Sequence, residues 1–263
     1  MTYAFGHSPT AAGRLELLDA VFAETTDALL DRAAPADPRH VLDLGCGPGV
    51  TTRRLVERFP TARAVAVDLS PEFVDIAHTR LGGLASVDVA DVTSDDLDPG
   101  PFDLIATRFL VTHLGDPTAA LAQWVRRLAP GGVLLVEETA SITSDDPVSA
   151  AYLELAGAVL GARAHDMYIG RRFADLVRDA DGSLATDAPV AHVDFVEAPL
   201  VPTVGEAARL FAMNLTTLRH DPVAVAGWPS TDLEGLHEGL VERSGRADRG
   251  PIRWSIGQLA LTR

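Results

Sequence analysis

The sequence predicts an α/β fold in which a mostly parallel, seven-stranded sheet carries helices on both faces. Short apolar runs alternate with segments of helical periodicity up to residue 140, which is typical of a covered parallel sheet. The first run ends in three closely spaced glycines, followed at once by a helical pattern. Two more apolar runs, at 191–200 and 252–261, supply the sixth and seventh strands.

Residues 1–34 are expected to form an irregular arm and one helix. No periodicity is visible in 1–13, whereas apolar residues from Arg14 to Ala33 recur on one face. The prolines at 35 and 38 break this helix before the first strand, at 41–44.

The predicted core, residues 35–140, continues with strands at 64–68, 86–91, 102–106 and 133–137. Ser70 and Pro71 supply an N-cap and a first-turn proline for the helix after the second strand. Asp116-Pro117 begins the helix before the fifth strand, and Pro130-Gly131-Gly132 is expected to end it.

The remaining segments, 141–190 and 203–245, are predicted to be helical and to cover the core as a lid. Asp146-Pro147 opens one helix, and another follows Gly170. The tetrads that begin at Thr203 and Thr231 have the spacing of capping boxes. No segment has the composition of a linker, so we expect a single domain over 1–263.

Composition argues against several classes of protein. All 22 basic residues are arginine. The net charge is −15, so the protein would repel phosphate backbones. No apolar run approaches the ~20 residues of a membrane span, and the N-terminus lacks the pattern of a secretory signal. Cys46 is the only cysteine. We expect a cytoplasmic monomer or homodimer that binds neither nucleic acid nor membranes.

The stretch from Val41 to Gly49, V-L-D-L-G-C-G-P-G, predicts a cofactor site. A strand that feeds a glycine turn and a helix lets a ligand approach the backbone and the helix N-terminus. The spacing is G-x-G-x-G, whereas dinucleotide sites have G-x-G-x-x-G. Asp43 would repel a pyrophosphate but could pair with an ammonium group, which disfavours a nicotinamide enzyme.

Three acids close three successive predicted strands, namely Asp43, Asp68 and Asp91. One such acid alone would more often be a solvated carboxylate. Because the ends of parallel strands share the sheet edge where α/β folds bind ligands, the three together predict a nucleoside site. Asp68 could accept both ribose hydroxyls, and Asp91 with the N–H of Val92 could contact an adenine edge.

These motifs resemble those of class I S-adenosylmethionine (SAM)-dependent methyltransferases. D-L-G-C-G-P-G is similar to the first motif of that family, and the segment 102–117 to its fourth-strand motif. The resemblance covers residues 38–140 and implies a Rossmann-like class I methyltransferase fold with SAM as cofactor. The cofactor contacts that it implies, together with our strand-end acids, are Tyr3, Asp43, Gly45, Cys46, Gly47, Gly49, Asp68, Leu69, Asp91, Val92 and Arg108.

Two shorter stretches resemble segments of small-molecule members of the family. The first, Y-A-F-G-H-S at 3–8, is similar to an arm that folds over SAM; this implies that Tyr3 and His7 lie near the cofactor and Arg14 near its carboxylate. The second, I-G-R-R-F at 169–173, is similar to a helix start beside the substrate cavity.

Methyl transfer from a sulfonium requires the protein to align the nucleophile, to exclude water and in some cases to remove a proton. The candidate catalytic residues are His113, Glu138 and His7. An unperturbed histidine, with a pKa near ~6.5, suits an oxygen or carbon acid, although His113 could instead stabilise a helix start. Candidate substrate contacts are Phe109, His165 and Tyr168. No metal site is expected.

The resemblance implies a methyltransferase that acts on an oxygen or carbon, less readily a nitrogen, of a small organic molecule such as a natural-product intermediate. Two alternatives stay open, because a fold does not fix a function. The chain could bind SAM and catalyse another reaction, such as a cyclisation, or it could be a non-catalytic partner subunit.

Overall fold

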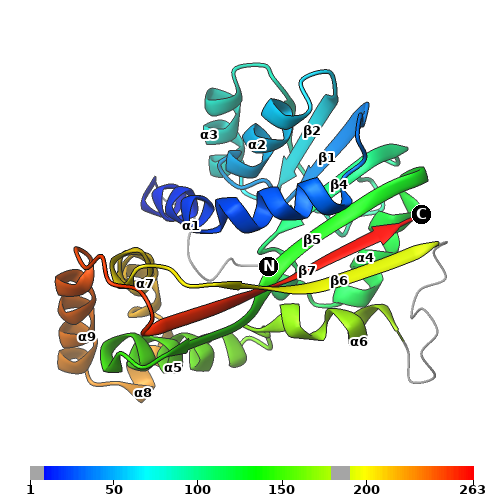
Figure 1. The fold of residues 1–263 in the computed structure, drawn as a ribbon. Helices are drawn as coiled ribbons and strands as arrows, with labels where there is room; N and C mark the ends of the chain where they lie inside the picture. Colours follow the sequence, from blue (N-terminus) through cyan, green and yellow to red (C-terminus); the bar gives the residue numbers. More distant parts are fainter. Residues whose placement is uncertain (1–8, 179–189) are drawn as a thin grey trace.

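A computed structural model describes residues 9–178 and 190–263, and its strands form one seven-stranded sheet in the order β3-β2-β1-β4-β5-β7-β6 (Figure 1). Strands β1 to β5 pair in parallel, and β7 runs antiparallel to both β5 and β6. The predicted mostly parallel sheet is therefore confirmed. The strands are β1 (His40–Leu44), β2 (Arg63–Asp68), β3 (Ser86–Val89), β4 (Phe102–Arg108), β5 (Leu128–Ser144), β6 (His192–Leu200) and β7 (Ile252–Thr262).

Helices cover both faces of this sheet. Capping follows the sequence at Ser70, whose Oγ accepts from Phe73 N, and at Thr203, which forms a full capping box with Glu206. The helices are α1 (Pro9–Ala33), α2 (Val50–Arg58), α3 (Pro71–Leu81), η1 (Val111–His113), α4 (Pro117–Arg126), α5 (Pro147–Gly161), η2 (Ile169–Arg172), α6 (Phe173–Val177), α7 (Val204–Leu218), α8 (Pro222–Gly227) and α9 (Ser230–Arg243). No helix in the described ranges is long and apolar enough to cross a membrane.

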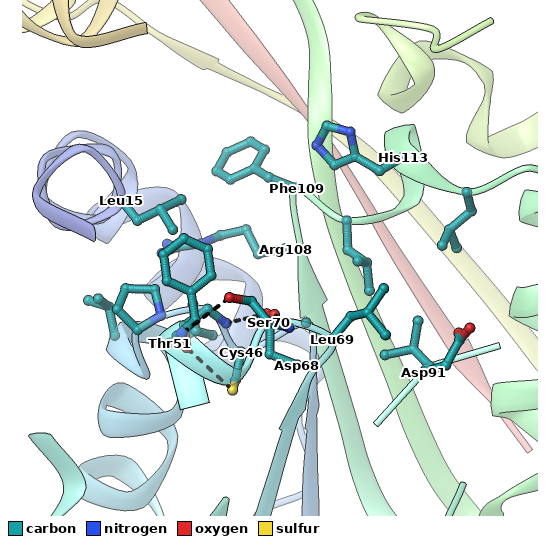
Figure 2. Close-up of a pocket in the computed structure, with 18 of the residues that line it drawn as sticks. Leu15, Cys46, Thr51, Asp68, Leu69, Ser70, Asp91, Arg108, Phe109 and His113 are labelled. Carbon is teal, nitrogen blue, oxygen red and sulfur yellow. Dashed lines mark hydrogen bonds between the residues drawn. The ribbon is translucent and has the colours of Figure 1, made fainter. Parts of the chain in front are cut away.

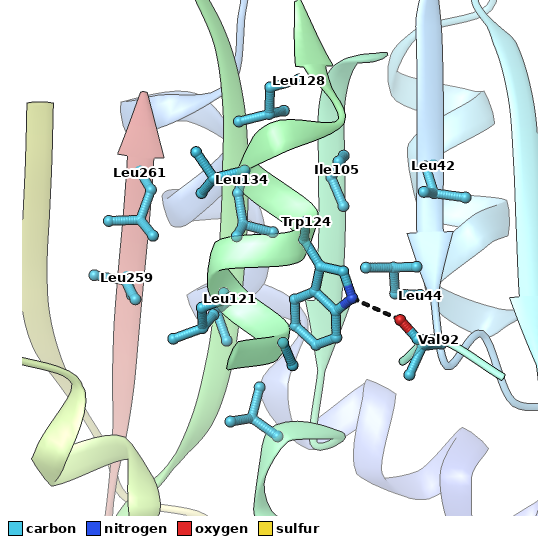
Figure 3. Close-up of a cluster of buried hydrophobic side chains, with 14 of the residues drawn as sticks. Leu42, Leu44, Val92, Ile105, Leu121, Trp124, Leu128, Leu134, Leu259 and Leu261 are labelled. Atoms are coloured by element: carbon cyan, nitrogen blue, oxygen red, sulfur yellow. Dashed lines mark hydrogen bonds between the residues drawn. The ribbon is translucent and has the colours of Figure 1, made fainter. Parts of the chain in front are cut away.

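Successive side chains of β1 point to opposite faces of the sheet. Leu42 and Leu44 face α4, where Trp124 is fully buried among leucines and donates its indole N–H to Val92 O at 2.9 Å (Figure 3). Val41 faces the opposite side, toward α1 and α2. The sheet core, defined as these two apolar layers, fixes the carboxyl ends of β1 to β4 at one edge.

A second core lies beside the sheet. It packs α5, α7, α8 and α9 against the N-terminal half of α1 and the far ends of β5 and β7 (Figure 1). Its aromatic centre is tight: the rings of Tyr152 and Phe211 stack at 4.3 Å, and those of Phe22 and Trp254 meet edge-on at 4.8 Å. The predicted helical covering therefore has its own hydrophobic interior.

Several predicted boundaries are wrong, and tertiary contacts explain why. The helix α1 begins at Pro9 within the supposed arm, because Ala11 and Ala12 pack against Phe73. Strand β5 begins early, at Leu128, which pairs with Phe102 of β4, and it continues to Ser144 because β7 pairs with it as far as that residue. Strand β3 ends at Val89, two residues before Asp91.

Two expectations about the lid also fail. The capping box at Thr231 does not form, since α9 begins at Ser230 and its N-cap, Pro229, makes no side-chain bond. The segment 169–177 does not cover the site, because Ile169, Phe173 and Val177 are buried in the sheet core.

Candidate active site

The glycine turn after β1 needs three glycines. Gly45, Gly47 and Gly49 have φ values of 67°, 52° and 79°, the left-handed region that side chains rarely adopt. A Cβ at Gly45 would lie 2.9 Å from the Leu110 side chain, and one at Gly49 would lie 3.0 Å from Ala77 Cβ. The turn therefore brings its backbone close to both the loop after β4 and α3.

Asp43 lies beneath this turn. A cavity opens beside the turn, and Asp43 is not among the residues that line it. Thr52 donates its hydroxyl to Asp43 Oδ2 at 2.6 Å, and burial raises the pKa of Asp43 to about 6. The contact ties the end of β1 to the first turn of α2. Cys46 is also buried, and burial raises the pKa of its thiol, as suits a packing residue and not a nucleophile.

Asp68, at the end of β2, lines the cavity with an oriented carboxylate. Its Oδ2 accepts from Gly47 N at 2.8 Å, and its Oδ1 accepts from Ser70 N at 2.9 Å (Figure 2). These two backbone donors fix the carboxylate between the glycine turn and the start of α3.

Asp91 and Val92 line the same cavity just beyond β3. Thr93 donates both its N–H and its hydroxyl to Asp91 Oδ1, at 2.8 and 2.6 Å, and these bonds lower the pKa of Asp91. The carboxylate therefore stays ionised at neutral pH. The apolar side chain of Leu69, 51% exposed, lies between this acid and Asp68 (Figure 2).

We call this space the outer cavity. It measures about 380 Å³, which falls within the usual range for small-molecule sites. The glycine turn, the ends of β2, β3 and β4, and α1 all contribute to it. Its walls include Leu15, Leu18, Gly45, Cys46, Gly47, Thr51, Asp68, Leu69, Asp91, Val92, Arg108, Phe109, Leu110, His113 and His165.

Arg108 contributes to the outer cavity but its guanidinium is held by α1. It donates to Asp19 Oδ1 at 2.6 Å and to Thr26 Oγ1 at 3.0 Å. Asp19 also pairs with Arg54 of α2, at 3.1 Å. Arg108 thus anchors α1 over the sheet edge.

A second, inner cavity of about 100 Å³ adjoins the outer one. Leu18, Phe109 and His113 line both cavities, and we call these three residues the neck. Phe109 adopts a φ of 56°, unusual for a bulky residue, and its ring lies 5.2 Å from that of Phe22. The other walls of the inner cavity are Arg14, Thr112, Glu138, Thr139, Ile142, Tyr152, Ala156, Leu160, Met167, Leu210, Phe211, Asn214 and Trp254.

His113 meets His165 edge-on, with ring centroids 5.3 Å apart. Burial, together with the nearby His165 and Arg14, lowers the pKa of His113 to about 3. Burial, together with Arg163, also lowers the pKa of His165. Both imidazoles are therefore neutral at pH 7, and His113 is a weak base in this environment.

Two adjacent acids at the end of the core part of β5 point to opposite faces. Glu138 lines the inner cavity and accepts from Thr112 N at 3.2 Å, so it caps η1, and burial raises its pKa to about 8. Glu137 faces α1, where Thr26 and Gln258 donate to it at 2.7 and 2.8 Å.

Comparison with known proteins gives a consistent answer. Residues 42–134 match the profile of a family described as "Methyltransferase domain". The trans-aconitate 2-methyltransferase of Streptomyces avermitilis is 34% identical over 168 residues, which cover 62% of this chain and 58% of the relative. Residues 42–134 therefore match a methyltransferase domain, and the chain is similar to class I SAM-dependent methyltransferases in sequence over this core and in fold.

Solved structures of low sequence identity share the methyltransferase fold. The phosphoethanolamine N-methyltransferase 2 of Haemonchus contortus has a TM-score of 0.58 at 17% identity, over 96% of this chain and 57% of that one. A cyclopropane synthase of Mycobacterium tuberculosis has a TM-score of 0.55 at 19% identity, over 92% and 84% of the two chains. The chain spans about half the length of the curated relatives that it matches.

The outer cavity has donors and acceptors of the kind that SAM requires. Asp68 presents an oriented carboxylate for ribose hydroxyls, and Leu69 and Val92 offer apolar surface beside Asp91 for a purine ring. Gly45 and Gly47 of the glycine turn line this cavity. In the described part of the chain, no group of three or more potential ligands is placed to hold a metal ion.

Three predicted site residues remain, namely Tyr3, His7 and Tyr168. Tyr3 and His7 lie outside the described residues. Tyr168 lines neither cavity; its hydroxyl donates to Ile142 O at 3.4 Å, and its neighbour Met167 is the wall residue. The sequence reasoning missed Asn214 and Trp254, because neither belongs to a motif.

Proposed function

We propose that the protein transfers a methyl group from SAM to an oxygen or carbon of a small organic molecule, such as a natural-product intermediate. The observation that carries the proposal is the junction of the two cavities at the neck. The outer cavity suits the cofactor, and the inner one suits an acceptor that approaches it in line. A relative named malonyl-[acyl-carrier protein] O-methyltransferase supports an oxygen acceptor.

The chain's own residues bind, orient and exclude water. Asp68 and Asp91 hold the nucleoside end of the cofactor, and Phe109 with Leu18 surrounds the point of transfer with apolar surface. When bound, SAM supplies an electrophilic methyl group, so the protein mainly has to align the acceptor atom with that group. Asp43, through Thr52, keeps the glycine turn in shape from below.

The three candidate bases take different roles in this proposal. His113 is neutral and weakly basic, so it aligns the acceptor through a hydrogen bond and does not take a proton in advance of transfer. Glu138 is a positioning residue, because its carboxyl group holds η1 and therefore His113. His7 stays a prediction.

The first test is a thermal-shift titration with SAM, S-adenosylhomocysteine and NADPH. A ligand that binds only the native state raises the melting temperature by mass action. We expect a shift with the two sulfur ligands and none with NADPH. Asp68→Ala should weaken SAM binding at least tenfold, since a hydrogen bond to a charged group contributes about 1.5–3 kcal/mol. Unchanged affinity by calorimetry would exclude the proposed site.

Release of S-adenosylhomocysteine with an acceptor then separates methyl transfer from the alternatives. A cyclase of the same fold would convert its substrate without consuming SAM, and a non-catalytic subunit would bind SAM without turnover. Either result would contradict the proposed reaction while leaving the cofactor site intact.

A further inference from the structure

Arg14 places a buried positive charge in the wall of the inner cavity. It is 5% exposed and lines the inner cavity but not the outer one. Because Arg14 lies one helical turn before Leu18 of the neck, both side chains share a face of α1. Burial lowers the pKa of His113 and raises that of Tyr152; the charge of Arg14 adds to the first shift and opposes the second, so the guanidinium lies near both groups.

Further donors lie on the same wall. Trp254 Nε1 is buried without a hydrogen-bond partner among the described residues. Asn214 Nδ2 donates to the hydroxyl oxygen of Tyr152 at 2.7 Å, which leaves the phenolic proton to be donated elsewhere. A guanidinium has five N–H donors and can hold a ligand oxygen in addition to its contacts within the protein. A donor-rich wall around a cation matches an acceptor-only anion.

The pKa values of His113 and Glu138 also favour an acceptor that is already an anion. Neither His113, which is hard to protonate, nor Glu138, which is largely protonated at pH 7, is suited to deprotonate an alcohol in advance. A carboxylic acid needs no such base, because it enters the site already ionised at neutral pH.

We propose that the acceptor is a small monocarboxylic acid whose carboxylate is held by Arg14 at the neck while its apolar end fills the inner cavity. The proposal rests on the proposed function and names its substrate class. One carboxylate oxygen forms a bond to the methyl carbon as the methyl–sulfur bond breaks, and that electron pair stays on sulfur. No proton moves, and the product is a methyl ester.

The inner cavity limits the size of the acid. An engineered apolar cavity of about 150 Å³ holds benzene, and this cavity of about 100 Å³ is open at the neck. An acid with one ring or a short branched chain therefore fits. Asn214 Oδ1, also without a partner among the described residues, can accept a hydrogen bond from a polar group on that end.

The test uses the full chain saturated with S-adenosylhomocysteine, with benzoate and its neutral analogue benzamide as probes. By calorimetry we expect benzoate to bind at least tenfold more tightly than benzamide. Arg14→Gln should abolish this preference and change the affinity for S-adenosylhomocysteine less than twofold. Arg14→Lys keeps the charge and should keep part of the preference. Arg39→Gln, at an exposed ion pair, is the matched control.

Two results would overturn the inference. One is equal binding of benzoate and benzamide to the wild-type protein. The other is an Arg14→Gln protein that retains the preference but binds S-adenosylhomocysteine more than tenfold more weakly, which would assign Arg14 to the cofactor. Failure of the wild-type protein to bind S-adenosylhomocysteine would instead contradict the proposed function itself.

Discussion

At the scale of single residues, burial decides what each acid at the sheet edge can do. Asp68 and Asp91 accept hydrogen bonds from backbone N–H groups, and Asp91 also from the Thr93 hydroxyl; both carboxylates lie at the cavity wall. Asp43 has the same sequence context but is covered by α2, so its carboxylate supports the turn. Glu138 lines the inner cavity but is only 2% exposed, and this burial favours its protonated form.

Glu138→Gln should therefore remove a pH-dependent loss of stability. The pKa of Glu138 rises from 4.5 in the unfolded chain to about 8 in the folded one. Between these values the unfolded chain binds fewer protons, so the wild-type protein loses stability as pH rises from about 4.5 to 8. Glutamine does not titrate and can still accept from Thr112 N. The variant should be more stable than wild type by roughly 4 kcal/mol at pH 8, with little difference at pH 4.

Urea denaturation of both proteins between pH 4 and pH 8.5 measures this gap. Glu242→Gln, on the exposed side of α9, is the matched control and should follow the wild-type curve. Parallel curves for wild type and Glu138→Gln would show that burial does not disfavour the charged form of Glu138.

At the scale of elements, close backbone contacts place η2 against the sheet. A Cβ at Gly257 of β7 would lie 2.3 Å from Gly170 O, and one at Gly170 would lie 2.5 Å from Glu138 O. Both obstacles are backbone atoms, which cannot swing aside as a long side chain can. This contact fixes η2 against the sheet and therefore holds Met167, two residues before η2, in the wall of the inner cavity.

Gly257→Ala should destabilise the protein by at least about 1–3 kcal/mol, because extra volume at a packed site forces the backbone apart. For a chain of this size each kcal/mol lowers the melting temperature by about 2–4 °C. Gly157→Ala is the control: it lies inside α5, where an added Cβ would meet nothing within 4 Å, and should gain about 0.5–1 kcal/mol. Equal melting temperatures for Gly257→Ala and wild type, by calorimetry, would exclude the steric argument.

At the scale of the whole molecule, two hydrophobic cores share the long strands β5 and β7. Leu134 of β5 and Leu259 of β7 belong to the sheet core, whereas Ile142 and Trp254 of the same strands belong to the second core. The same two strands therefore run through both cores and connect the inner cavity to the sheet. We expect the two cores to unfold together.

Leu215→Ala tests that coupling. Leu215 is fully buried in the second core, so the truncation should cost about 2–5 kcal/mol. We expect one calorimetric transition, shifted as a whole to lower temperature. Two resolved transitions, of which only the lower moves, would show that the cores fold independently.

The sequence by itself determined the sheet, the glycine turn and the positions of Asp68 and Asp91. These features depend on interactions within a few residues: apolar runs form strands, glycines adopt positive φ, and acids follow strand ends. The alternation of strands and helices along the chain then predicts that these groups lie together at the carboxyl edge of the sheet, where α/β folds bind ligands. The family motifs carry the same local information.

Only the tertiary structure decided which residues surround the inner cavity, where we propose that the acceptor binds. Arg14, Tyr152, Asn214 and Trp254 come from segments far apart in the chain, and the second core brings them to one cavity. Packing also buried Asp43 beneath α2 and made His113 a poor base, since a pKa depends on solvation and on neighbours that sequence distance does not reveal. Local rules place the proposed cofactor site, whereas the non-local packing of α1, α5, α7 and β7 forms the inner cavity.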